Sequence, residues 1–394
     1  MPSISCRINQ LIPDRYVKDV TAKFQFASPP HKRSVSSFTM GEMEHLVAML
    51  VGGYVQSYVD MFYLLNRPTT DKSDIKGDTD LKSVADTMVR AEKARRDGAP
   101  DQVYACYNEL ADYFSDTGDS IVGSFFLEKC LATCKLSGNV QGETKSNFKL
   151  GMVYQLISVT KAIAYHERHL ELCTDQSDEA GKQDARKQLA VVYKRRAEEL
   201  EESDETLAES VAFHDRCVVL AVENKDAEGK AMANYRLGSV YIRLQKPERA
   251  IVALTKYLDH SEKVNNVFAK AEASSKLAIA YLLIEDKISK AIEYLEQTLE
   301  IAIEIGNTDL QASACVSLGA VHTKAGDLNK ARAYFDQNYN IKRNTTSHHE
   351  SNISRVLVGL SLGGSRKAVF QNMVTSDMKS LLEWKVQRQF PQVH

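Results

Sequence analysis

The hydrophobic pattern of the chain repeats with a period of about forty residues. In each copy a Leu is followed by a small residue and, three positions further on, by an aromatic ring or a histidine. The six copies begin at Leu110, Leu150, Leu189, Leu237, Leu277 and Leu318. Because residues three and four apart share one helix face, each copy predicts a helix whose small residue lets a neighbouring helix approach closely.

A second apolar block follows and completes a helix pair. It places a large residue four positions after a small one, and its copies begin at Ala162, Ser210, Ala250, Ala291 and Ala331. One interval between the motif leucines is longer, 48 residues, because a charged insertion occupies residues 195–206. Stacked helix pairs form a solenoid, so the sequence predicts an all-α, right-handed α-solenoid of about six helix pairs.

The order of the two blocks resembles the tetratricopeptide repeat, L-G-x2-Y followed by A-x3-F. The resemblance covers residues 100–345. Residues 39–99 are predicted to form helices over 41–66 and 81–96, with a polar linker at 67–80. Residues 346–394 are predicted to hold a degenerate repeat, interrupted by a turn at the Leu-Gly-Gly-Ser run 362–365, and a capping helix. The apolar residues of that cap are Met378, Leu381, Leu382 and Trp384.

Charge is nearly balanced along the chain. The 50 basic and 52 acidic residues give a net charge of -2, so neither nucleic acid nor a membrane surface is expected as a partner. Residues 1–38 are the exception and are predicted to be a basic, extended arm that meets a partner. Its basic residues are Arg7, Arg15, Lys18, Lys23, Lys32 and Arg33. The first residues lack the order of a signal peptide, which favours the cytoplasm.

Catalytic and metal-binding motifs are absent from the sequence. His166, His169 and Cys173 share a helix face and could ligate zinc, but His166 takes the position where other copies have Leu254 or Phe335. That position favours packing in the core. The sequence therefore predicts no enzyme, no cofactor, no metal and no small-molecule substrate.

The groove of the solenoid is the predicted binding surface, because superhelical repeat arrays use their concave face. Positions two before and two after each motif Leu are expected to face it, and basic residues follow about a turn later. The predicted partner-binding residues are Phe148, Met152, Lys187, Lys194, Arg195, Tyr235, Arg243 and Ile279. They suit an amphipathic or acidic helix. The alternative is that a segment of this chain fills the groove.

Three segments outside the motifs narrow the resemblance. Residues 49–65, 126–131 and 377–385 resemble a tetratricopeptide repeat family of the axoneme in motile cilia and sperm flagella. The resemblance implies a structural adaptor located in the cytoskeleton of the cilium or flagellum. The implied partners are dynein-arm subunits, doublet microtubules or intraflagellar transport proteins. A cargo adaptor of intraflagellar transport and a peptide-binding regulatory repeat protein remain alternatives.

Overall fold

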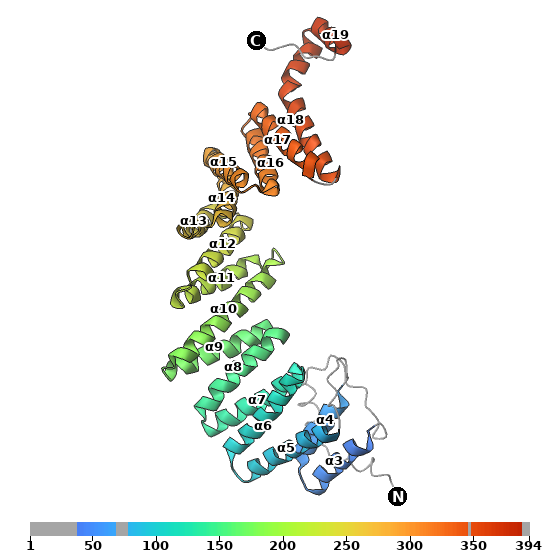
Figure 1. Ribbon diagram of the computed structural model, residues 1–394, viewed down its shortest axis with the longest axis vertical. Helices are drawn as coiled ribbons and strands as arrows, with labels where there is room; N and C mark the ends of the chain where they lie inside the picture. Colours follow the sequence, from blue (N-terminus) through green and yellow to red (C-terminus); the bar gives the residue numbers. More distant parts are fainter. Residues whose placement is uncertain (1–37, 68–77, 346–347, 388–394) are drawn as a thin grey trace. The chain divides into compact units, whose positions relative to one another are not determined.

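The computed structural model describes residues 38–67, 78–345 and 348–387, and these residues contain helices but no strand (Figure 1). The chain divides into two compact units, Met1–Arg196 and Ala197–His394. In both units, consecutive helices pack side by side as pairs. The prediction of an all-α helical-repeat solenoid is confirmed.

The N-terminal unit begins with three helices that precede the repeats, and repeat pairs follow (Figure 1). Its helices are α3 (Met40–Val51), α4 (Val55–Asn66), α5 (Asp78–Arg96), α6 (Pro100–Asp116), α7 (Ser120–Ser137), α8 (Val140–Ile157), α9 (Val159–Asp175) and most of α10 (Glu179–Glu201). α6 with α7 and α8 with α9 form the first two repeats. The long α10 contains the first half of the charged insertion.

The helix predicted over residues 41–66 is two helices, so that prediction was wrong. Gly53 takes a left-handed φ of 78°, and its backbone N–H donates to the carbonyl of Leu50 at 3.0 Å. Glycine adopts this conformation without strain, and the Gly-Gly pair therefore ends α3. The apolar residues on both sides share one face in the sequence pattern, which concealed the turn.

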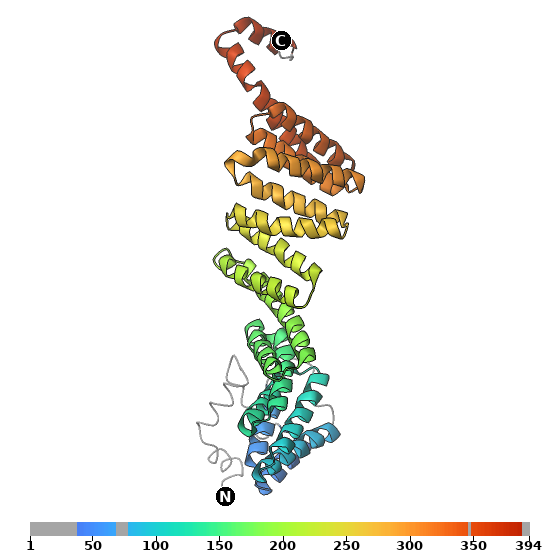
Figure 2. The same cartoon turned by 90° about the vertical axis from the view of Figure 1, so that its left-hand side faces the viewer.

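The C-terminal unit continues the array. Its helices are α11 (Leu207–Glu223), α12 (Ala227–Arg243), α13 (Pro247–Lys263), α14 (Val267–Leu282), the short 3-10 helix η2 (Glu285–Lys287), α15 (Ile288–Glu304), α16 (Thr308–Lys324), α17 (Leu328–Thr345), α18 (His348–Thr375) and α19 (Met378–Gln387). Figure 2 shows the successive helices of this unit lying across one another as layers.

The small residue of the first block has the packing role that its position suggests. A Cβ atom added to Gly238 would lie 2.4 Å from Leu254 of α13. The same addition at Gly319 would lie 2.5 Å from the Phe335 ring of α17. Such distances are far inside van der Waals contact, so the glycine lets the second helix of the pair approach and seat its large residue.

α18 is continuous through the Leu-Gly-Gly-Ser run, so the predicted turn at residues 362–365 was wrong. Packing along α17 explains the difference. A Cβ added at Gly364 would meet Leu328 of α17 at 3.2 Å, which marks a close approach of the two helices. Two glycines cost a helix about 2 kcal/mol relative to alanine, and tertiary contacts of a long helix offset that cost.

Candidate binding groove

A groove of about 650 Å³ lies on the N-terminal unit, on the face formed by α6, α8, the end of α9 and the start of α10. Each wall comes from a different helix. Asn108 lies on α6, Phe148 on α8, His169 on α9 and Asp184 on α10. The first helices of three successive repeats thus contribute to one hollow, as expected for the concave side of a repeat array.

Phe148 is the apolar centre of the groove. Its half-buried ring lies 5.3 Å from the ring of His169 and 6.3 Å from that of His166, measured between centroids. Burial, with a smaller contribution from His169, lowers the pKa of His166 to about 4. Burial also lowers the pKa of His169. Both imidazoles are therefore neutral at pH 7 and present uncharged rings to Phe148.

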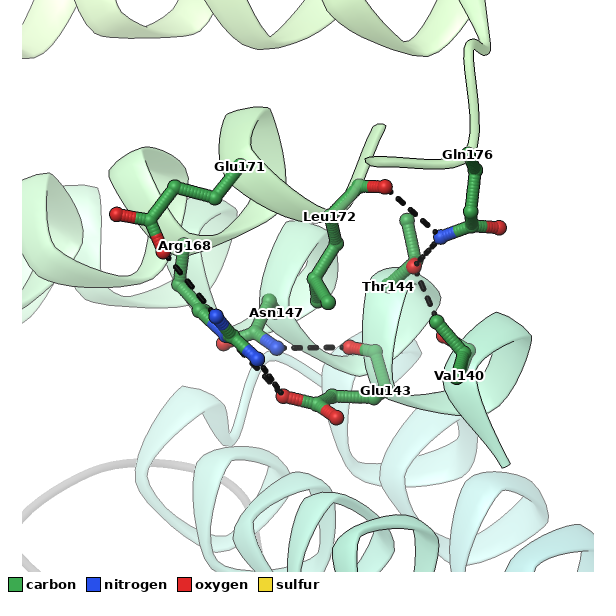
Figure 3. Close-up of polar contacts among 8 residues, drawn as sticks. All are labelled: Val140, Glu143, Thr144, Asn147, Arg168, Glu171, Leu172 and Gln176. Atoms are coloured by element: carbon green, nitrogen blue, oxygen red, sulfur yellow. Dashed lines mark hydrogen bonds and ion pairs between the residues drawn. The ribbon is translucent and has the colours of Figure 1, made fainter. Parts of the chain in front are cut away.

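A polar network holds α8 against α9 beside the groove (Figure 3). Arg168 donates from Nη2 to Oε1 of Glu143 at 3.1 Å, and Glu143 is largely buried. Gln176 donates from Nε2 to Oγ1 of Thr144 at 2.7 Å and to the carbonyl of Leu172 at 3.1 Å. These bonds lock the two walls, so the hollow between them is formed before any partner arrives.

Lys149 joins α8 to α6 on the floor of the groove. Its Nζ donates to Oδ1 of Asp112 at 2.6 Å and to Oδ1 of Asn108 at 2.9 Å. Asn108 also donates to the second carboxylate oxygen of Asp112 at 2.8 Å. The charge of Lys149 is thereby matched within the protein.

The remaining charges of the lining have opposite signs on opposite walls. Lys145 of α8 is exposed. Asp178 and Asp184 lie at the start of α10, where Asp178 accepts from the backbone N–H of Gly181 at 3.0 Å. The groove is therefore suited to a segment that carries both charges around one apolar anchor.

The predicted groove residues are divided between the two units. Phe148 lines the hollow, and Met152 is exposed one turn along α8. Lys187 and Lys194 are exposed on α10. In the C-terminal unit, Tyr235 donates its hydroxyl to Glu272 of α14 at 2.6 Å, and Ile279 is exposed on that helix.

Arg195 and Arg243 bond to the preceding repeat. Arg195 donates to the carbonyl of Gln155 at the end of α8, and Arg243 donates to that of Glu201 at the end of α10 at 2.9 Å. Lys324 repeats the arrangement on Leu282 at the end of α14, at 3.3 Å. A cation at a helix C-terminus satisfies an orphan carbonyl and opposes the helix dipole. This gives the bases a structural role that their spacing alone did not indicate.

The two ends of the chain differ in how much of each lies within the described residues. The predicted basic arm lies outside the described residues. At the other end, Trp384 packs edge to face against Phe370 of α18, with ring centroids 5.2 Å apart. Leu381 is half-buried, whereas Met378 and Leu382 are exposed. α19 thus covers the far end of α18, and its action as a cap on the repeat array stays a prediction.

Several polar contacts of the structure could not be predicted from the repeat pattern. The charged insertion reaches the next repeat, where Oε1 of Glu201 lies 2.6 Å from Nε2 of His214, and Asp204 accepts from Arg243 at 2.7 Å. Glu143 is a comparable case, because only its buried position shows that it pairs with Arg168. From sequence alone, a carboxylate in a charged run is expected to be exposed to solvent. Its partner becomes apparent only once the position of the neighbouring helix is known.

Residues 38–67, 78–345 and 348–387 contain no cluster of metal ligands and no membrane-spanning helix. His169 and Cys173 approach to 3.7 Å, but the described side chains include no group of three His, Cys, Asp or Glu that could hold a metal ion. None of the helices described is long and apolar enough to cross a membrane.

Comparison with known proteins identifies one repeat. Residues 231–262, which span most of α12 and α13, match the family profile described as tetratricopeptide repeat. This stretch contains Leu237, Gly238 and Leu254, so the profile and the packed helix pair coincide. A search of the curated proteins finds no match to the chain.

Solved structures with a related arrangement of helices include three at low identity. BtubC (BKLC) from P. vanneervenii is 18% identical, over 68% of this chain and 93% of its own, with a TM-score of 0.38. A signal transduction ATPase with a tetratricopeptide repeat sensor from Pyrococcus horikoshii is 14% identical, over 90% and 55%, with a TM-score of 0.43. Aspartyl phosphate phosphatase F from Bacillus subtilis is 13% identical, over 89% and 88%, with a TM-score of 0.39.

Proposed function

We propose that this chain is a non-catalytic adaptor whose N-terminal unit binds a segment of a partner protein in the groove at Phe148. The observation that carries the proposal is the pre-formed hollow, with one apolar anchor point and charged residues on its two walls. Tetratricopeptide repeats bind proteins, and hollows on their concave face receive peptide segments. Locked walls reduce the entropy lost on binding.

The bound segment is helical or extended and has a defined charge order. An apolar side chain contacts Phe148, an acidic residue lies near Lys145, and a basic residue lies near Asp178 and Asp184. Lys149 contributes little net attraction because Asp112 already accepts from it. The proposed ligand is thus amphipathic with both signs of charge, rather than purely acidic.

The site of action proposed is the axoneme of motile cilia or flagella, where the partner would be a dynein-arm subunit or a microtubule-associated protein. The support for this location is the resemblance of residues 49–65, 126–131 and 377–385 to tetratricopeptide repeat protein 29. In this setting the chain is a built-in structural part that supports motility.

Fractionation of isolated cilia tests the location. A built-in part stays with axonemes after detergent and salt extraction, whereas a cargo adaptor of intraflagellar transport is released with the membrane-plus-matrix fraction. Recovery in the released fraction would replace the structural role by the transport role.

Crosslinking mass spectrometry on the same axonemes tests the groove. We expect crosslinks from Lys145 to a partner protein, and these should be lost in cells that carry Asp184→Lys with Phe148→Glu. Lys256→Glu on α13 is the matched control, because Lys256 is an exposed lysine of the C-terminal unit. Crosslinks to the partner that survive the groove double variant would place the binding surface elsewhere.

A further inference from the structure

α18 carries a row of exposed side chains at alternating spacings of three and four residues. The row follows the face opposite to the buried Ser354 and Ser361, and it continues to Val374. Its first six positions are Ile353, Val356, Leu360, Gly363, Lys367 and Phe370. Alternating three-and-four spacing is the pattern of a coiled-coil seam.

The exposure of this seam is large for apolar side chains. Ile353 is 52% exposed, Val356 57% and Leu360 67%, and Phe370, whose ring also packs against Trp384 of α19, is 37% exposed. Figure 1 shows α18 running past α17 toward α19, so a large part of its length projects beyond its neighbour. Several large apolar side chains exposed along one face of a projecting helix are typical of an interaction surface.

Gly363 is the position of the seam that has no side chain. A Cβ atom built on Gly363 would meet no atom of the described residues within 4 Å. Within the repeats, by contrast, a large side chain of the second helix packs over the glycine of the first. Leu254 packs over Gly238, and Phe335 packs over Gly319. Gly363 is therefore an exposed point of α18 where another side chain has room to approach the backbone.

We propose that the seam pairs with α18 of a second copy of this chain, in an antiparallel, two-fold symmetric helix pair. One register pairs the first six positions: Ile353 faces Phe370 of the second copy, Val356 faces Lys367, and Leu360 faces Gly363. Symmetry repeats each contact, so six layers form. The exposed Leu360 of each copy packs over Gly363 of the other, where the backbone leaves room for it.

The parallel pairing of two copies is disfavoured by the same residues. It would place Lys367 against Lys367 inside the seam, where like charges repel. It would also place Gly363 against Gly363 and leave a void. In the antiparallel pair the aliphatic stem of Lys367 covers Val356, and its ammonium reaches the edge.

The size of the surface predicts a weak to moderate dimer. The exposed apolar area on the seam is about 500 Å² per copy. The pair would therefore bury on the order of 1,000 Å², together with part of the residues flanking the seam, which is near the low end for stable interfaces. A dissociation constant of roughly micromolar size follows. The surface lies on the C-terminal unit and does not depend on the proposed groove function.

Sedimentation velocity of the full chain over 1–100 µM tests the pairing, with two charge variants at one position. Val356→Lys sets a lysine against Lys367 of the second copy and should weaken the dimer at least tenfold. Val356→Glu sets an acid there and should leave the dissociation constant within about threefold of the parent, or tighten it. Both replace an exposed side chain, so melting of the monomer at low concentration should match the parent.

Val252→Lys on α13 is the control, since Val252 is also 57% exposed but lies away from α18. It should leave the dimer unchanged. A chain that is monomeric at 100 µM overturns the proposal. Equal weakening by Val356→Lys and Val356→Glu, or no weakening by either, overturns the antiparallel register and with it the proposed pair.

Discussion

The repeat of α8 and α9 and the repeat of α12 and α13 share one geometry but differ in chemistry. In the first, His166 seats over Gly151, where an added Cβ would lie 2.4 Å from the ring. In the second, Leu254 seats over Gly238 at the same distance. Around His166 lie Gln155 at 3.0 Å and the His169 ring near Phe148. The spacing of the motif thus fixes where the large residue packs, but it does not fix whether that residue is polar or apolar.

The surroundings of Leu254 and His166 explain how each side chain is accommodated in the core. Leu254 belongs to a continuous apolar core that reaches from α12 into α16 and includes Leu237, Tyr241, Leu277, Leu295 and Leu318. His166 is wholly buried, and its Nδ1 has no hydrogen-bond partner among the described residues. The apolar repeat gains stability from buried area, whereas the polar repeat depends on keeping an imidazole neutral.

The largest effect is expected from filling the space under Leu254. Gly238→Leu should lower the free energy of unfolding by about 3–5 kcal/mol, because the new side chain overlaps Leu254 and forces α12 and α13 apart. Urea unfolding measures it. Gly359→Leu on α18 is the control, since a Cβ there meets no atom of the described residues within 4 Å, and it should not lower the free energy of unfolding. Equal losses in both variants would contradict the assigned packing.

A pH-dependent effect is expected in the polar repeat. The folded-state pKa of His166 is lowered to about 4, below the ordinary value of 6.5, so the unfolded chain binds the proton more readily. Its contribution to stability is complete above pH 6.5 and is lost as pH falls toward 4. The loss relative to pH 7 should be about 2 kcal/mol at pH 5 and about 3 kcal/mol at pH 4.

His166→Leu, which copies Leu254, provides the matched variant for this effect. The difference in free energy of unfolding between the two proteins should change in favour of the leucine as pH falls from 7 to 5. Chemical denaturation at the two pH values measures it. A difference that stays constant would show that His166 is not the group that titrates.

The smallest effect is expected at the contacts between repeats. Arg243→Ala removes two exposed hydrogen bonds, to Glu201 and Asp204, and should cost about 1 kcal/mol. Arg195→Ala removes the bond to Gln155 and should also destabilise the chain. Thermal melts compare them with Lys256→Ala, which should be neutral. A loss in Lys256→Ala as large as the loss in Arg243→Ala would contradict the role assigned to these contacts.

The repeat pattern predicted most of the architecture because its signal is periodic and local. Leu237 and Gly238 recur in register with their equivalents, and a helix pair follows from that spacing alone. The groove was predicted less completely. Phe148 was identified from its offset to the motif Leu, but Lys145, Asp178 and Asp184 were not, because they come from a neighbouring turn and from the start of the next helix.

The sequence by itself determined the helix pairs, their order and the place of each small residue, since these depend on contacts between residues three, four or about sixteen apart. Tertiary structure alone decided the roles of residues whose partners lie one repeat away. Arg195 and Arg243 bond helix ends about forty residues earlier, and Glu201 reaches His214 across a turn. It also decided that α18 runs unbroken through the glycine pair Gly363 and Gly364, because packing against α17 outweighs their weak local preference for a helix.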